Sequence, residues 1–250
     1  MLDSELQYYI GKILCTADPK DPSRFLHRDL HRIFLVFGFT GSGKDTVINE
    51  FLKVNKEYPF AKFIRTLTRT KRPSELEMVD GFFIQQKLFD HLKDHGRFFY
   101  SYERYDYLKF GYDTLSLLFQ LTRNNVVMVG GTEKNYDGLM DGIHSIFGSI
   151  PVTTIFVNRP KEDILAHIKK RGGDPEEMEA RLKFIEKEWY EKPQKPMDYV
   201  IWNNNLTDSV HQFQGIVQEI LGSSSGGKVS DADSAFALLS GSSATTEQRL

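Results

Sequence analysis

Residues 32–46 contain the feature that most restricts the fold of this chain: a continuous apolar run, RIFLVF, followed by the glycine-rich loop GFTGSGKDT. A short apolar run that ends at a glycine loop is typical of a buried central strand of a parallel sheet. After the loop, Val47, Ile48, Phe51 and Leu52 have the spacing of one helix face. The sequence therefore predicts a strand, a loop and a helix in direct succession.

The glycine loop has the spacing G-x-x-x-x-G-K, which is used to wrap the phosphates of a nucleotide. Its backbone N–H groups converge on one point, and the N-terminus of the following helix adds partial positive charge. Lys44 supplies a mobile cation that can follow the γ-phosphoryl group. We therefore expect ATP to bind at Gly38, Thr40, Gly41, Ser42, Gly43, Lys44, Asp45 and Thr46.

Asp45 occupies the position where this motif usually places the Ser or Thr that coordinates magnesium. A carboxylate is an acceptable magnesium ligand, so Asp45 could replace that hydroxyl directly or through water. Alternatively, Thr46 keeps a hydroxyl near the phosphates, and Asp45 caps the first helical turn, where negative charge is favoured. The sequence leaves both alternatives open, and we expect Mg2+ at Asp45 or Thr46.

Length, charge and cysteine content exclude several classes of protein. A chain of 250 residues fits one catalytic-sized domain, and its net charge of -2 lacks the positive excess that nucleic acids demand. The single cysteine, Cys15, excludes an internal disulfide and a Cys-rich zinc site. The N-terminus is a poor secretory signal, and no stretch approaches the roughly 20 apolar residues of a membrane helix. We expect a cytoplasmic protein that binds neither nucleic acid nor membranes.

The chain divides into three predicted regions. Residues 1–31 form a helical N-terminal extension, residues 32–221 form the domain that carries the phosphate loop, and residues 222–250 form a flexible Gly/Ser-rich tail. The alternative for this tail, in which FALL is the only apolar island, is a short partner-binding or export segment. Further strand-like runs at 126–131, 153–158 and 198–204 are separated by lengths that admit crossover helices. The predicted fold is α/β, with a doubly wound parallel sheet.

Five stretches of the chain, between about residues 32 and 220, resemble the guanylate kinase family of P-loop nucleoside monophosphate kinases. They are GFTGSGKDT, IRTLTRTKRP with VDGFFI, GRFFYSY with FGYDT, KKRGGDPEEMEARL, and DYVIWNNNLTDSV. The resemblance implies a P-loop kinase core with small acceptor-binding and lid insertions. It also implies ATP and Mg2+ as cofactors and a small phosphorylated acceptor as partner.

A cluster of cations follows the first predicted helix, since Arg65, Arg69, Lys71 and Arg72 lie within eight residues. Such a cluster suits an acceptor phosphate. The resemblance implies that Arg69 and Arg72 bind this phosphate. It also implies that Lys44 and two lid residues, Arg171 and Arg181, act on the transferring phosphoryl group, with His167 in place of one further lid arginine, and that Asn203 contacts the adenine of ATP.

The positions that read the base depart most from this family. The expected glutamate and aspartate that hold guanine are replaced by about Tyr100 and Gly131, and two phosphate-binding tyrosines by Phe82 and Phe110. Loss of both carboxylates predicts loss of guanine discrimination. Nearby tyrosines either stack a nucleobase or pack the acceptor insertion onto the core. The candidate acceptor-binding residues are Arg65, Arg69, Arg72, Phe82, Tyr100, Phe110 and Tyr112.

A second branch of this fold, the ribose 1,5-bisphosphate phosphokinases, resembles the chain at Gly43–Thr46, at Val129–Thr132, and at Asn203 and Asn204. Their loop carries Gly-Lys-Asp-Ser, so an aspartate after the lysine is compatible with an active kinase. The predicted function is ATP-dependent transfer of a phosphoryl group to a phosphate of a nucleoside monophosphate or ribose phosphate. The alternative is a non-catalytic interaction module of guanylate kinase fold.

Overall fold

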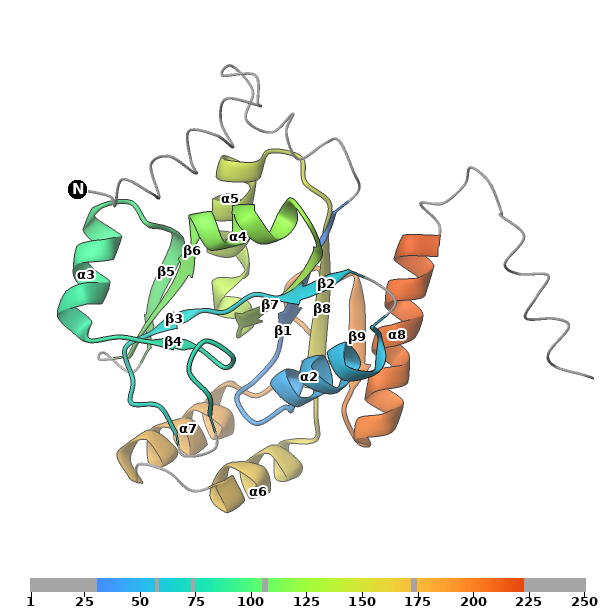
Figure 1. Ribbon diagram of the computed structural model, residues 1–250. Helices are drawn as coiled ribbons and strands as arrows, with labels where there is room; N and C mark the ends of the chain where they lie inside the picture. Colours follow the sequence, from blue (N-terminus) through green and yellow to red (C-terminus); the bar gives the residue numbers. More distant parts are fainter. Residues whose placement is uncertain (1–30, 57–58, 73–74, 105–107, 172–174, 223–250) are drawn as a thin grey trace, which may run out of the picture.

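The computed structural model describes residues 31–56, 59–72, 75–104, 108–171 and 175–222 (Figure 1). The predicted N-terminal extension up to residue 30 and the predicted tail from residue 223 lie outside the described residues. In the parts that the structure describes, no helix is both long enough and apolar enough to cross a membrane.

The core of the described chain is a parallel sheet in the order β2-β7-β1-β8-β9. Three of the predicted apolar runs form its centre, and the run at 198–204 forms an edge strand. The remaining strand, β2, was not predicted from the sequence because it is only three residues long. The strands are β1 (Ile33–Phe37), β2 (Phe60–Lys62), β7 (Asn125–Gly131), β8 (Val152–Asn158) and β9 (Tyr199–Trp202).

Helices cover both faces of this sheet, which confirms the doubly wound arrangement (Figure 1). Successive side chains of β1 point to opposite faces, so Phe34 and Val36 enter one core and Ile33 and Leu35 the other. Helices α2 and α8 pack on the Phe34 face, and α4 and α5 pack on the other. Their bounds are α2 (Lys44–Val54), α4 (Thr114–Leu121), α5 (Tyr136–Phe147, preceded by the 3-10 turn η2, Glu133–Asn135) and α8 (Leu206–Gly222).

A smaller sheet, in the order β4-β3-β6-β5, lies between β2 and β7 in the sequence and forms the predicted acceptor insertion. Tyr112 joins it to the core, because its hydroxyl donates to the carbonyl of Val129 at 2.8 Å and its ring stacks on Phe63 with 5.9 Å between centroids. The elements are β3 (Thr66–Leu67), β4 (Phe82–Phe83), α3 (Gln86–Asp94), β5 (Phe98–Arg104) and β6 (Leu108–Asp113).

The predicted lid corresponds to the helices α6 (Lys161–Arg171) and α7 (Pro175–Glu188). They follow β8 and lie below the sheets in Figure 1. Ile164 and Ile168 of α6 and Ile185 of α7 are buried in the same core as α4 and α5. The lid is therefore anchored to the core by its apolar side chains, and Glu177 of α7 contacts Arg72 of the acceptor insertion.

Replacement of Phe213 by alanine tests the packing of α8 on α2. Phe213 is fully buried, with its ring centroid 4.6 Å from that of Phe51 and 6.5 Å from that of Phe34. Removing the ring leaves a cavity between the two helices and β1, so the free energy of unfolding should fall by about 3–5 kcal/mol. Urea unfolding measures this loss, and Gln218→Ala, on the exposed side of the same helix, is the control. A loss below about 1 kcal/mol would contradict the packing described.

Candidate active site

The phosphate loop leaves the carboxyl end of β1, where its neighbours β7 and β8 lie on either side. In open parallel sheets, ligands bind at this kind of switch in strand order. The backbone N–H of Gly38 donates to the carbonyl of Gly131 at 2.9 Å, which holds the start of the loop against β7. Gly43 has a φ of 85°, and a Cβ there would come within 2.2 Å of the amide nitrogen of Asn203. Only glycine fits this position, because both the backbone conformation and the space exclude a side chain.

Asn203 supports the loop from the end of β9. Its Nδ2 donates to the carbonyl of Ser42 at 2.8 Å, and its Oδ1 accepts from the hydroxyl of Ser209 at 3.0 Å. Asn203 and Ser42 are both buried, and neither lines the cavity described below. The structure therefore gives Asn203 a role in positioning the loop, and its contact with adenine stays a prediction.

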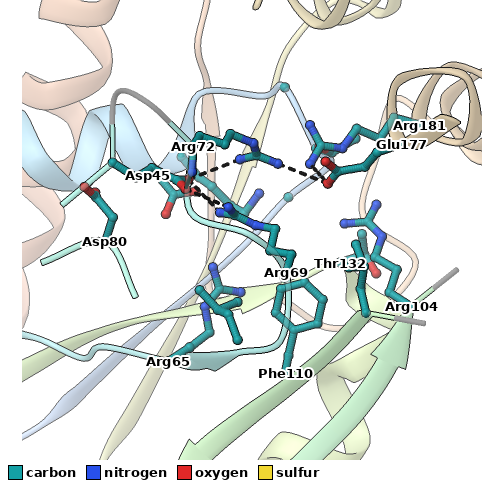
Figure 2. A pocket seen from close by; sticks show the side chains of 18 of the residues that line it. Asp45, Arg65, Arg69, Arg72, Asp80, Arg104, Phe110, Thr132, Glu177 and Arg181 are labelled. Atoms are coloured by element: carbon teal, nitrogen blue, oxygen red, sulfur yellow. Dashed lines mark hydrogen bonds and ion pairs between the residues drawn. The ribbon is translucent and has the colours of Figure 1, made fainter. Parts of the chain in front are cut away.

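A cavity of about 650 Å³ brings the three predicted parts of the site together (Figure 2). Its size suits a small-molecule ligand. The loop forms one wall, the arginines of the acceptor insertion form a second, and the lid helices close the third. Among the predicted site residues, those that line it are Gly38, Thr40, Gly41, Gly43, Lys44, Asp45, Thr46, Arg65, Arg69, Arg72, Phe110 and Arg181.

Lys44 begins α2 and is buried, with its side chain lying across the loop. Its Nζ donates to the carbonyl of Phe39 at 3.1 Å. The ammonium group is thus held at the mouth of the loop, where the backbone N–H groups converge. This placement suits a cation that contacts the terminal phosphates of a bound nucleotide.

Asp45 and Thr46 are exposed in the first turn of α2, and both line the cavity. The N-cap residue of this helix is Gly43, and Asp45 is the acidic residue of its first turn. The charge of Asp45 therefore has the position that the capping alternative requires, and both alternatives for Asp45 stay predictions.

Carboxylate and hydroxyl oxygens fit a magnesium ion, which also takes water and phosphate oxygens as ligands. In the described parts of the chain, no group of three His, Cys, Asp or Glu side chains could hold a metal ion. The donor set at Asp45 and Thr46 is therefore suited to an ion that arrives with the phosphates, rather than to a closed protein site.

Two glutamates connect the arginines of the acceptor insertion to α7. Arg69 binds Glu75 through two hydrogen bonds of 2.6 Å, and Arg72 donates to the same carboxylate at 3.2 Å. Arg72 also donates to Glu177 at 3.1 Å, and Glu177 in turn accepts from Arg181. Figure 2 shows these side chains as one continuous series, which we call the arginine chain. It fixes the guanidinium groups that the resemblance assigns to phosphate binding.

The carboxyl group of Glu75 is ionised in this arrangement. Burial alone would raise its pKa, but the hydrogen bonds and charges of Arg69 and Arg72 act more strongly, so the pKa lies below its ordinary value. The carboxylate stabilises two guanidinium groups that would otherwise repel each other.

Other predicted acceptor residues lie outside the cavity lining. Tyr112 is fully buried and bonded to Val129, and the hydroxyl of Tyr100 donates to Asn135 at 3.1 Å. Phe82 lies on β4 and does not line the cavity, although its backbone N–H donates to the carbonyl of the lining residue Arg65 at 2.9 Å. Arg171 ends α6, and its side chain is outside the described part of the structure. Tyr100 and Tyr112 thus pack the insertion onto the core, which is one of the two alternatives predicted, whereas Tyr102 lines the cavity.

Several lining residues were not predicted from the sequence. Glu177 lies 105 residues after its partner Arg72, and nothing in the local pattern indicates this pairing, although its spacing of four residues from Arg181 is that of a helical ion pair. The other missed residues that line the cavity are Asn49, Leu67, Glu75, Asp80, Tyr102, Arg104, Leu108, Thr132 and Lys170.

Comparisons with known proteins agree with this geometry. No family model matches the chain. Curated guanylate kinases are similar to it: that of Desulfotalea psychrophila is 26% identical over 188 residues (74% of this chain, 88% of its own length). That of Coxiella burnetii is 28% identical over 190 residues (74% and 85%), and that of Thermotoga maritima 28% over 189 residues (75% and 86%).

A crystal structure of guanylate kinase from Anaplasma phagocytophilum shares the fold, with a TM-score of 0.54 and 18% identity. The structural match covers 76% of this chain and 86% of the Anaplasma phagocytophilum chain. The resemblance to guanylate kinase-like proteins that the motifs indicated is thus confirmed, as is the α/β fold.

Replacement of Asn203 by aspartate tests the support of the loop. The change keeps an acceptor for Ser209 but sets a carboxylate oxygen against the carbonyl of Ser42 in place of a donor. Loss of one buried hydrogen bond, with repulsion in its place, should weaken MgATP binding about tenfold or more. Calorimetric titration measures the change, with the exposed neighbour Asn204→Asp as control. Equal affinity in both variants would refute the supporting role.

Replacement of Glu75 by glutamine tests the arginine chain through its pH dependence. A carboxyl with a lowered folded pKa stabilises the protein above its unfolded pKa, near 4.5, and loses that effect as the pH falls through the folded pKa. At neutral pH the variant should be less stable by about 2–3 kcal/mol. The difference from wild type should narrow as the pH falls below about 4.5.

Urea unfolding over a series of pH values measures this difference. Glu50→Gln removes an exposed partner of Lys53 and should cost under about 1 kcal/mol at any pH. A difference for Glu75→Gln that stays constant at acid pH would show that the ionised carboxylate does not stabilise the arginine chain.

Proposed function

We propose that this guanylate kinase-like chain is an ATP-dependent phosphotransferase that moves the γ-phosphoryl group of MgATP onto a phosphate of a small acceptor. The candidate acceptors are a nucleoside monophosphate or a ribose phosphate. One observation carries the proposal: a single cavity holds the loop with Lys44 on one wall and Arg69 and Arg72 on another, with Arg181 of α7 alongside (Figure 2).

The chemistry requires positioning and charge neutralisation more than proton transfer. An oxygen of the acceptor phosphate forms a bond to the γ-phosphorus, and the bond from that phosphorus to the β,γ-bridging oxygen breaks. The electron pair leaves with ADP, and the acceptor becomes a diphosphate. Because the attacking oxygen is already anionic, no general base is needed, which agrees with a cavity whose lining holds more Lys and Arg side chains than carboxylates.

The loop and Lys44 bind the donor. Backbone N–H groups of the loop and the N-terminus of α2 hold the phosphates, and Lys44 contacts the transferring group. Asp45 and Thr46 would hold Mg2+, which supplies further neutralisation of phosphate charge when bound.

The arginine chain orients the acceptor. A guanidinium group has five N–H donors, so Arg69 and Arg72 can bind a phosphate while Glu75 fixes their direction. Arg181, bound to Glu177, lies where it can neutralise the phosphoryl group in transit. We include Arg171 as a second lid cation on the resemblance alone.

The alternative, a non-catalytic interaction module, draws support from the same arginine chain. The carboxylates of Glu75 and Glu177 already engage three arginines, so the cavity is electrostatically satisfied in part without a ligand. Such a module would not bind MgATP. It would also not convert a phosphorylated acceptor.

Replacement of Lys44 by alanine separates these functions. ADP formation from MgATP should appear in the wild type with at least one acceptor from a panel of nucleoside monophosphates and ribose phosphates. It should fall by about 100-fold or more in the variant, because the loop cation is lost. Lys53→Ala, in the exposed last turn of the same helix, should keep full activity. A wild-type protein with neither MgATP binding nor acceptor-dependent ADP formation would establish the module instead.

A further inference from the structure

Helix α6 of the lid lies directly against the phosphate loop. Gly41 of the loop has a φ of 84°, and a Cβ there would come within 3.1 Å of the Ile164 side chain and within 3.2 Å of the Ile168 side chain. Both isoleucines are buried. A side chain at position 41 would crowd the helix, so glycine at this position keeps α6 beside the place where we expect the phosphates of ATP.

The spacing of residues along α6 decides which of its side chains reach the cavity. His167 and Lys170 are three residues apart, so they lie on the same side of the helix, and both line the cavity. Lys169 is rotated about 100° from Lys170 around the helix axis, and it does not line the cavity. The two neighbouring lysines therefore have different surroundings, although they carry the same charge.

Lys170 differs from Arg181, the lid cation described above, in having no fixed partner. Arg181 is bound by Glu177, which also accepts from Arg72. Lys170 is exposed and makes no hydrogen bond or ion pair with another residue in the described part of the chain. An ammonium group on a flexible four-carbon stem can follow a phosphoryl group that moves, whereas a guanidinium group held by a carboxylate is less free to do so.

Charge compensation along the helix accounts for only part of this pattern. α6 has Glu162 and Asp163 in its first turn, and Lys169 and Lys170 lie in its last turn. This distribution suits the partial charges at the two ends of a helix. The effect is similar for both lysines, so it does not explain why only Lys170 of the two lines the cavity.

We propose that Lys170 is a catalytic residue of the phosphotransfer proposed above, and that its ammonium group contacts the phosphoryl group during transfer from ATP to the acceptor. This inference rests on the proposed function and adds a residue to the same site. Lys170 forms and breaks no covalent bond. It donates hydrogen bonds to the phosphoryl oxygens from the side of α6, whereas Lys44 does so from the loop.

Replacement of Lys170 by methionine tests this role, because methionine keeps an apolar stem and removes the charge. With the acceptor that gives the highest rate of ADP formation, kcat should fall about 10–100-fold, while KM for ATP and for the acceptor should change less than about threefold. Lys169→Met is the matched control, since it removes the same charge from the same turn but outside the cavity, and it should keep the wild-type kcat. An unchanged kcat in Lys170→Met, or an equal loss in both variants, would overturn the inference and leave the proposed function intact.

A pair of double variants distinguishes the loss of a cation from damage to α6. Position 167 lines the same cavity one turn earlier, so an arginine there should offer positive charge to the same space. His167→Arg combined with Lys170→Met should therefore recover most of the lost kcat, whereas Lys169→Arg combined with Lys170→Met should recover none of it. A kcat in the first double variant no higher than that of Lys170→Met would count against a cation acting in the cavity and overturn the inference.

Calorimetric titration with ADP, Mg2+ and aluminium fluoride tests the inference without turnover, because the fluoride complex stands in for the phosphoryl group in transfer. The affinity for this complex should weaken about 10-fold or more in Lys170→Met, and the affinity for MgADP alone should not change. The same result in a protein that forms no ADP with any acceptor would support the role of Lys170 and refute the phosphotransferase.

Two other outcomes of this titration separate the inference from the function. Equal affinity of the wild type and Lys170→Met for the fluoride complex would refute the role of Lys170, while acceptor-dependent ADP formation by the wild type would still support the proposed function. A wild-type protein that binds neither MgADP nor the fluoride complex would refute both.

Discussion

The burial of β1 on both faces is the constraint on which the rest of the structure depends. All its side chains are fully buried, and its two neighbours pair with it in parallel along its whole length. A strand in this position can end only where the sheet ends, so the glycine loop emerges at the carboxyl edge, between the segments that follow β7 and β8. The insertion and the lid, which belong to the connections around those strands, are thereby brought to the same place. The cavity is a result of sheet order as much as of any side chain.

The arginines of this cavity are paired in two different ways when no ligand is bound. Glu75 and Glu177 separate guanidinium groups that would otherwise repel one another. Arg65 and Arg104 are held by ring faces, which orient a cation at little electrostatic expense. The first arrangement resembles an internal substitute for phosphate, and the second orients two guanidinium groups by contact with aromatic rings.

Local patterns in the sequence were sufficient for the core of this fold and insufficient for the contacts between its parts. The apolar runs at 33–37, 126–131 and 153–158, with the glycine spacing, predicted strands, loop and helix because each signal lies within a few residues. Neither β2, three residues long, nor the pairing of Arg72 with Glu177 has such a signal. The position of Asn203 after the last strand indicated a functional residue. Its hydrogen bond to the carbonyl of Ser42, 161 residues earlier, has no local signal in the sequence. The replacement of the guanine-reading acids, at about Tyr100 and Gly131, could be predicted from the sequence. The place of Arg104 in the cavity lining could not, because Arg104 lies in a segment of alternating charge.

The arginine chain also has a kinetic consequence. Because Arg72 donates to both Glu75 and Glu177, the acceptor insertion and α7 cannot separate without breaking charged hydrogen bonds that are only partly shielded from water. Exchange of molecules through this boundary is then governed by ionic strength, since dissolved ions compete for the same groups. A higher ionic strength would speed the opening of the site and would also weaken its binding of any phosphate. The rate of exchange would therefore rise while the occupied fraction of the site falls.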